Sequence, residues 1–193
     1  MIHGDQATHT VAVFDSSALI VVAQRDAIDD WRIIYEHLAL PPAVEQECIG
    51  TSASQGSPDA LRIQTALQSG TLARSTFTAA QLKQANEWHA RSRLGMGECQ
   101  VLAVVHSVAN TIAIIEDKRA RSLARAHQIP YTTIQMSPLE GYIRQTMAYA
   151  RAAALMRQVA TAMHTDLAVF KALELALNAL ATERGDMHGT TQD

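Results

Sequence analysis

The chain has 193 residues, a net charge of −3, 48% hydrophobic and 18% charged residues, and two cysteines. This length and composition suit one globular domain, with or without an appended helical segment. They exclude a disordered chain and a disulfide scaffold. No apolar run approaches the roughly 18 residues needed to span a bilayer, and residues 1–5 lack the regions of a signal peptide. We therefore expect a cytoplasmic protein in which Cys48 and Cys99 are reduced core residues.

The charge is unevenly distributed along the chain. Residues 1–117 carry 7 basic and 13 acidic side chains, whereas residues 118–157 carry seven basic ones against Glu140 alone. An acidic part followed by a basic part is typical of a metal site beside a phosphate-binding surface. Ordinary solvated helix faces would explain the same distribution equally well.

Short apolar segments alternate with amphipathic ones from residue 11 onward. Strands are predicted at 11–14, 38–40, 71–75, 111–115 and 131–134, the third of them at an edge. Helices are predicted at 17–23, at 30–38 with Asp30 as cap, from 43, at 58–68, at 78–91, from Glu98 to 108, and through Leu123. This alternation predicts an α/β protein: a three-layer α/β/α sandwich around a parallel sheet of four to five strands.

The pattern also predicts a domain organisation. Residues 1–10 show no periodicity and are expected to be flexible, and residues 11–140 hold the α/β domain. An alanine-rich helical extension follows at 141–183, and residues 184–193 are expected to be disordered. The extension could pack on the domain's own surface, form a homodimer or receive a partner peptide.

Four acidic residues stand where a parallel sheet gathers its chemistry. Asp15 and Asp117 follow the two strongest strands, and Glu47 and Glu98 lie near the N-terminal ends of helices that follow loops. Four carboxylates from separate segments suit Mg²⁺ or Mn²⁺, which prefer oxygen ligands. For each acid alone a simpler role is open, because the aspartates could cap helices and the glutamates could be solvated.

Other sites fit the sequence poorly. The first strand is followed by Asp15-Ser16-Ser17 instead of a glycine-rich dinucleotide turn, and no phosphate-binding P-loop or GxSxG elbow occurs. An aspartate-based phosphatase would need a second aspartate at position 17. A signalling receiver domain would need an aspartate after its third strand, and residues 71–75 end without one.

Four segments together resemble a known family. These segments are Val13-Phe14-Asp15-Ser16-Ser17-Ala18-Leu19, Pro41-Pro42-Ala43-Val44-Glu45-Gln46-Glu47, Gly97-Glu98-Cys99-Gln100-Val101-Leu102-Ala103 and Ile114-Ile115-Glu116-Asp117-Lys118-Arg119-Ala120-Arg121. They are similar, in order, to the acidic segments of PIN-domain ribonucleases, and the Gly-Glu that opens the third resembles VapC-type toxins of toxin–antitoxin pairs.

The resemblance implies a function and a site. It implies an endoribonuclease dependent on Mg²⁺ or Mn²⁺, acting on RNA, with an antitoxin protein as a possible partner. The metal-binding and catalytic acids implied are Asp15, Glu47, Glu98 and Asp117, with Glu45 as the competing choice for the second, Ser17 as support for the first, and Lys118, Arg119 and Arg121 as candidate phosphate contacts.

The chain departs from the family pattern at two places. Ile115 replaces a small hydroxyl residue, and no further acid follows Asp117. These departures keep open an alternative function, a PIN-like module that binds RNA or a partner without cutting.

Overall fold

A computed structural model describes residues 10–51 and 56–186. Residues 1–9, 52–55 and 187–193 lie outside the described residues, and with them most of the predicted flexible N-terminus and disordered tail. The chain divides into two compact units, Met1–Thr133 and Ile134–Asp193.

Within its described residues, the first unit is built on a five-stranded parallel sheet with the order β3-β2-β1-β4-β5. The strands are β1 (Val11–Phe14), β2 (His37–Leu40), β3 (Leu72–Arg74), β4 (Thr111–Ile114) and β5 (Tyr131–Thr132). The predicted parallel sheet is confirmed, with the predicted edge strand β3 at one side. Phe14 pairs with Ile114, so the central strands β1 and β4 end at the same edge of the sheet.

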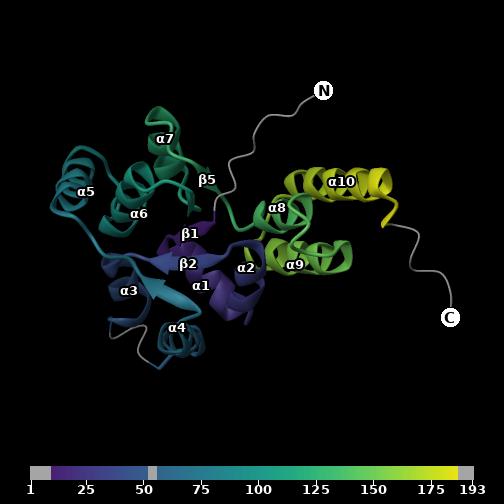
Figure 1. Cartoon of the computed structure of the whole chain (residues 1–193), viewed down its shortest axis with the longest axis horizontal. Coiled ribbons are helices and arrows are strands. Elements are labelled where there is room, and N and C mark those ends of the chain that lie inside the picture. Colours follow the sequence, from purple (N-terminus) through teal and green to yellow (C-terminus); the bar gives the residue numbers. More distant parts are fainter. Residues whose placement is uncertain (1–9, 52–55, 187–193) are drawn as a thin grey trace. The chain divides into compact units, whose positions relative to one another are not determined.

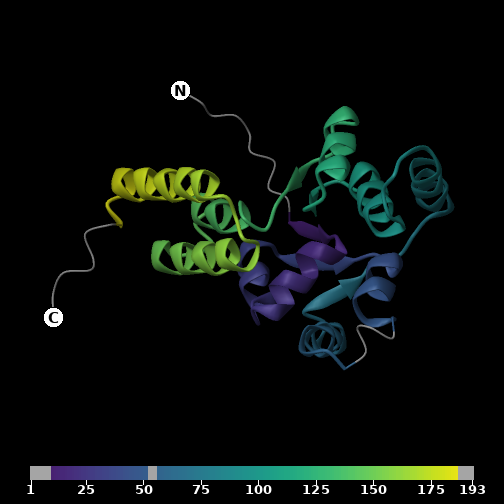
Figure 2. The same ribbon diagram turned by 180° about the vertical axis from the view of Figure 1, so that it is seen from behind.

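Helices cover both faces of this sheet. They are α1 (Ser16–Gln24), α2 (Ile28–Ile34), α3 (Pro42–Ile49), α4 (Pro58–Ser69), α5 (Ala79–Arg91), α6 (Met96–Ser107) and α7 (Lys118–Ala126). The chain runs from β1 outward to β3 and then returns to β4 and β5, so right-handed crossovers put the two sets of helices on opposite faces. Figure 1 shows α4 and α7 on opposite sides of the sheet, and Figure 2 shows the same layers from behind. The α/β/α sandwich is therefore confirmed.

The sheet forms the centre of the core. Phe14, Leu40 and Ile114 are fully buried. Because helices cover both faces, these strands are continuous apolar runs and not alternating ones. Burying side chains of this size stabilises the fold by about 1.5–3 kcal/mol each. Cys48 and Cys99 are buried free cysteines, as predicted for core residues.

Local sequence signals set the ends of several helices. Thr78 and Gln81 form the capping box of α5, in which each side chain accepts a hydrogen bond from the other residue's backbone N–H, at 3.2 and 2.8 Å. Gly70 ends α4 with a φ of 79°, a left-handed conformation that glycine adopts without a steric cost. The start of α5 and the end of α4 therefore agree, to within one residue, with the helices predicted at 78–91 and 58–68.

The sequence misplaced the second helix. α2 begins at Ile28 with Ala27 as its N-cap, so Asp30, predicted as the cap, lies buried inside the helix. Leu38 is shared by this predicted helix and the predicted strand 38–40, and the strand is correct, because Leu38 belongs to β2 and pairs with Ala12 of the central strand. Pairing with β1 satisfies the backbone of this buried segment, and that requirement outweighs the helical periodicity.

The second unit is helical throughout most of its described residues. It contains α8 (Ser137–Ile143), α9 (Tyr149–Ala162) and α10 (Leu167–Arg184), and the three pack on one another. The unit begins at Ile134, earlier than the boundary expected after residue 140, because α8 packs with α9 and α10. No described helix is long and apolar enough to cross a membrane.

Polar contacts fasten the end of α10 to α8. Arg184 donates hydrogen bonds to the carbonyl oxygens of Tyr142 and Ile143, at 2.7 and 3.0 Å, and its guanidinium lies 4.8 Å from the centre of the Tyr142 ring. The Tyr142 hydroxyl donates to Asp186 at 2.6 Å. The helical extension thus has internal anchors of its own.

Candidate active site

Asp15 lies at the carboxyl end of the central strand, where ligands of open α/β sheets gather. Its side chain is 2% exposed. One carboxylate oxygen accepts the N–H of Ala18 at 2.7 Å and so caps α1, and the other accepts the N–H of Glu116 at 2.8 Å. Asp15 therefore joins the start of α1 to the turn that follows β4, and its orientation is fixed from both sides.

Burial makes the charged form of Asp15 costly. Desolvation raises the pKa of this carboxyl from 3.8 to about 7, and the charges of Glu116 and Glu98 act in the same direction. The two backbone N–H groups oppose the rise but do not cancel it. A buried carboxyl with a raised pKa at a strand end is a candidate functional group.

Glu98 lies in the first turn of α6 and is half-buried. The helix begins at Met96 and not at Glu98 as predicted, because Gly95 is its N-cap. The Glu98 carboxylate folds back over this cap, since a Cβ on Gly95 would stand 2.6 Å from Oε2 of Glu98. Burial raises the pKa of Glu98, and the charges of Glu47 and Asp117 raise it further, against the N–H groups of Glu98 and Gly95.

Glu47, on α3, reaches the same turn of α6. A Cβ on the buried Gly97 would stand 2.8 and 3.0 Å from the two carboxylate oxygens of Glu47. A direct hydrogen bond holds the two helices at this separation, because Oε1 of Gln100 accepts the N–H of Ala43 at 2.9 Å. Glycine at position 97 therefore leaves the space into which Glu47 extends.

Glu45, the competing second acid, has another partner. Both of its carboxylate oxygens accept hydrogen bonds from the Arg74 guanidinium, each at 2.8 Å. This bidentate pair links α3 to the edge strand β3. The contacts therefore favour Glu47 as the acid beside Glu98.

Asp117 caps α7 and is exposed. Its Oδ1 accepts the N–H groups of Arg119 and Ala120 at 2.7 and 2.8 Å. The capping role considered for both aspartates is thus real, but it does not exclude a second role. Asp117 also acts electrostatically on Glu98, as Glu47 does.

Glu98 is the centre of the acidic arrangement. The charges of Glu47 and Asp117 raise the pKa of Glu98, and the charge of Glu98 in turn raises the pKa of Asp15. In the described part of the chain, no three acidic, histidine or cysteine side chains stand close enough to form a ready-made metal site. The donor set is nevertheless all oxygen, and Gly97 leaves a cradle for Glu47 that a Cβ would fill. This chemistry fits a hard divalent cation.

The predicted phosphate contacts and the predicted support for Asp15 differ in exposure and in their hydrogen-bond partners. Lys118 and Arg119 are exposed at the start of α7. Arg121 instead donates hydrogen bonds to the carbonyl oxygens of Ile115 and Glu116, at 3.4 and 2.5 Å, and so braces the turn after β4. Ser17 is exposed in α1, while the hydrogen bonds described for Asp15 come from backbone groups.

Sequence reasoning missed the residues that arrange the acids. Gly97 opens the third acidic segment, but the space that it leaves for Glu47 cannot be inferred from the motif, and Gly95 lies outside that segment. Gln100 lies in the same segment, within the predicted helix from Glu98 to 108, and a glutamine among apolar residues is a signal of a buried polar contact. Its partner, the Ala43 N–H, could not be identified without the fold.

Comparison with known proteins points to one family. A family model described as a PIN domain matches residues 11–135. Searches of curated proteins and of solved structures give no match. The matched region covers β1 through β5 and all four acids.

Proposed function

Because the chain belongs to the PIN-domain family, whose members are generally nucleases, we propose that it is a divalent-metal-dependent endoribonuclease that hydrolyses RNA phosphodiester bonds. The observation that carries this proposal is the electrostatic coupling of Glu98 to Asp15, Glu47 and Asp117 at the carboxyl edge of the sheet. Uncompensated carboxylates that raise one another's pKa gain stability from a bound cation.

Asp15, Glu47, Glu98 and Asp117 would hold Mg²⁺ or Mn²⁺. When bound, such an ion supplies charge neutralisation at the phosphate and lowers the pKa of an attacking water. The chain's own contribution is positioning. Two backbone N–H groups fix Asp15, and the Gly95 cap fixes Glu98. Lys118 and Arg119, exposed at the start of α7 directly after Asp117, would contact the phosphate.

Cleavage of a labelled RNA with and without Mg²⁺ or Mn²⁺ tests the proposal. Asp15→Asn and Glu98→Gln should reduce cleavage by at least about a hundredfold while the thermal transition stays cooperative. Glu45→Gln is the matched control, because that acid is paired with Arg74. Undiminished cleavage by the purified Asp15 and Glu98 variants would rule out the proposed site.

One alternative function has an observation in its favour. Asp117 is engaged as a helix cap, and no ready-made cluster of three ligands occurs among the described residues. A PIN-like module that binds RNA or a partner without cutting would show this arrangement. Calorimetric titration with Mn²⁺ separates the two functions. A metal-dependent nuclease should release a heat of binding that Glu98→Gln removes, whereas the binding module should release none that depends on Glu98.

We further propose that the nuclease serves as the toxin of a toxin–antitoxin pair, with an antitoxin protein as its partner. The Gly97-Glu98 opening of the third acidic segment supports this proposal through its resemblance to VapC-type toxins. Growth arrest on expression, relieved by a small neighbouring gene, is the expected result. Growth unaffected by the active nuclease would favour a housekeeping role.

A further inference from the structure

The outer side of α7 carries positive charge without a carboxylate partner in the described residues. Lys118, Arg119 and Arg125 are exposed, and the helix contains no acidic residue. Lys118, Ser122 and Arg125 recur at intervals of four and three residues, so they share one face of the helix. We call these residues, together with Arg119, the α7 stripe.

The stripe begins at the proposed active site. Lys118 and Arg119 follow Asp117, the N-cap of α7. Arg125 lies seven residues after Lys118, a distance of about 10 Å along the helix axis at 1.5 Å per residue. A polyanion that extends from the acids along α7 therefore meets Arg125 after Lys118 and Arg119.

Arg125 is held in place without losing its charge. Its Nη2 donates a hydrogen bond to the hydroxyl of Tyr131 in β5 at 3.2 Å. A neutral phenol orients the guanidinium but does not neutralise it, so the remaining N–H groups stay available to a phosphate. By contrast, the exposed Arg74 is neutralised by Glu45.

We propose that the α7 stripe binds the backbone of single-stranded RNA and leads it from the acidic site toward Arg125 and Tyr131. This inference rests on the proposed nuclease function and names the path of its substrate. The exposed side of α7 offers Lys, Arg and Ser side chains and no large apolar one, a composition suited to phosphate contacts. A protein partner would need apolar or aromatic residues at its centre, and the stripe has none.

The test is RNA binding at several salt concentrations, measured by fluorescence anisotropy with a labelled single-stranded oligonucleotide in chelator, where no cleavage occurs. Arg125→Gln should lower the slope of log K against log salt by about 0.7, the value for one phosphate contact to a single strand. Its Kd should rise by a similar factor for RNAs of different sequence. Tyr131→Phe should keep the slope, because it removes the orienting hydroxyl and not the charge.

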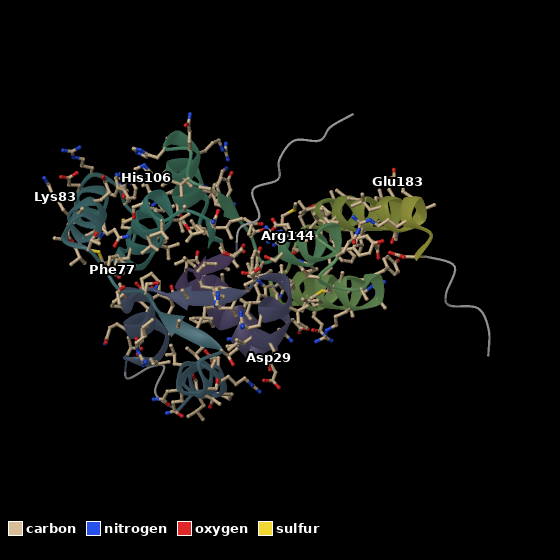
Figure 3. The ribbon with its side chains drawn as sticks, viewed as in Figure 1. Asp29, Phe77, Lys83, His106, Arg144 and Glu183 are labelled. Atoms are coloured by element: carbon tan, nitrogen blue, oxygen red, sulfur yellow. The ribbon has the colours of Figure 1, made fainter. Side chains whose placement is uncertain are left out.

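Two substitutions serve as matched controls. Arg25→Gln removes an exposed arginine at the C-terminal end of α1, and Lys83→Gln removes the exposed lysine on α5 that lies 4.0 Å from Glu87 (Figure 3). Both should leave the slope unchanged. Equal slopes for Arg125→Gln and the unmodified protein would overturn the proposal.

Two further results separate the path from the nuclease function. If polyglutamate competes as well as RNA at equal charge, the stripe is a site for acidic proteins and the proposal fails. If the slope falls for Arg125→Gln but the unmodified protein never cleaves RNA with Mn²⁺, the path stands and the nuclease function fails. If the unmodified protein cleaves RNA but Arg125→Gln leaves the slope unchanged, the nuclease function stands and the path fails.

Discussion

The carboxylate of Glu47 occupies the space that a side chain on Gly97 would take. Ideal Cβ placement on this buried glycine gives distances of 2.8 and 3.0 Å to the two carboxylate oxygens. The atoms in the way are the far end of a flexible side chain, so the backbone need not move. Glycine at position 97 therefore matters because it leaves room for the Glu47 carboxylate and not because of its backbone conformation.

Gly97→Ala should therefore weaken metal binding without harming the fold. Alanine is about 1 kcal/mol better than glycine inside a helix, so the thermal transition should stay or rise. Displacement of Glu47 should raise the Kd for Mn²⁺, measured by calorimetry, by about tenfold. In a Glu47→Gln background the same change should have little further effect. An additive loss would show that Gly97 acts through something other than Glu47.

The two glutamates of α3 should differ sharply in their effects. Glu47→Gln should reduce cleavage and Mn²⁺ affinity strongly, because its carboxylate lies against Gly97 in the first turn of α6 and its charge acts on Glu98. Glu45→Gln loses only an exposed pair with Arg74 and should keep cleavage within about twofold. Parallel cleavage assays check this contrast. A greater loss from the Glu45 variant would exchange the roles assigned to the two residues.

Asp15 should make the stability of the metal-free protein depend on pH. Its folded pKa of about 7 exceeds the ordinary 3.8, so the folded state binds more protons between these values. Stability should then fall as the pH rises from 4 to 7, by up to about 4 kcal/mol at 1.36 kcal/mol per pKa unit. Urea unfolding in chelator measures this fall, and Asp15→Asn should remove most of it. A stability that rises over this range in the unmodified protein, and not in the variant, would contradict the raised pKa.

The sequence predicted what local patterns determine. Apolar runs and their order specify the parallel sheet, and the strand ends at Phe14 and Ile114 bring Asp15 near Glu116. The same local patterns leave Leu38 open between the end of a helix and the start of a strand, because strand pairing decides its state and pairing is not local. The choice between Glu45 and Glu47 depends in the same way on a distant residue, Arg74.

Gln100 illustrates the part of the site that only the fold reveals. Its side chain accepts the N–H of Ala43, a residue 57 positions away, and so sets the distance between α3 and α6. Glu47 and Glu98 lie on these two helices. The amide of Gln100 does not need to touch the metal to influence it, because a change in helix spacing moves one acid relative to the other.

Gln100→Leu should lower both stability and metal affinity. The Ala43 N–H would lose its partner in a part-buried position, a cost of about 1–3 kcal/mol. Ser57→Ala is the matched control, because the Ser57 hydroxyl accepts the N–H of Ala60 at the start of α4 and its loss costs about 1 kcal/mol. Only Gln100→Leu should raise the Kd for Mn²⁺ in calorimetry. If both variants lose stability and neither loses metal affinity, Gln100 supports the fold alone and the spacing of the two acids tolerates its absence.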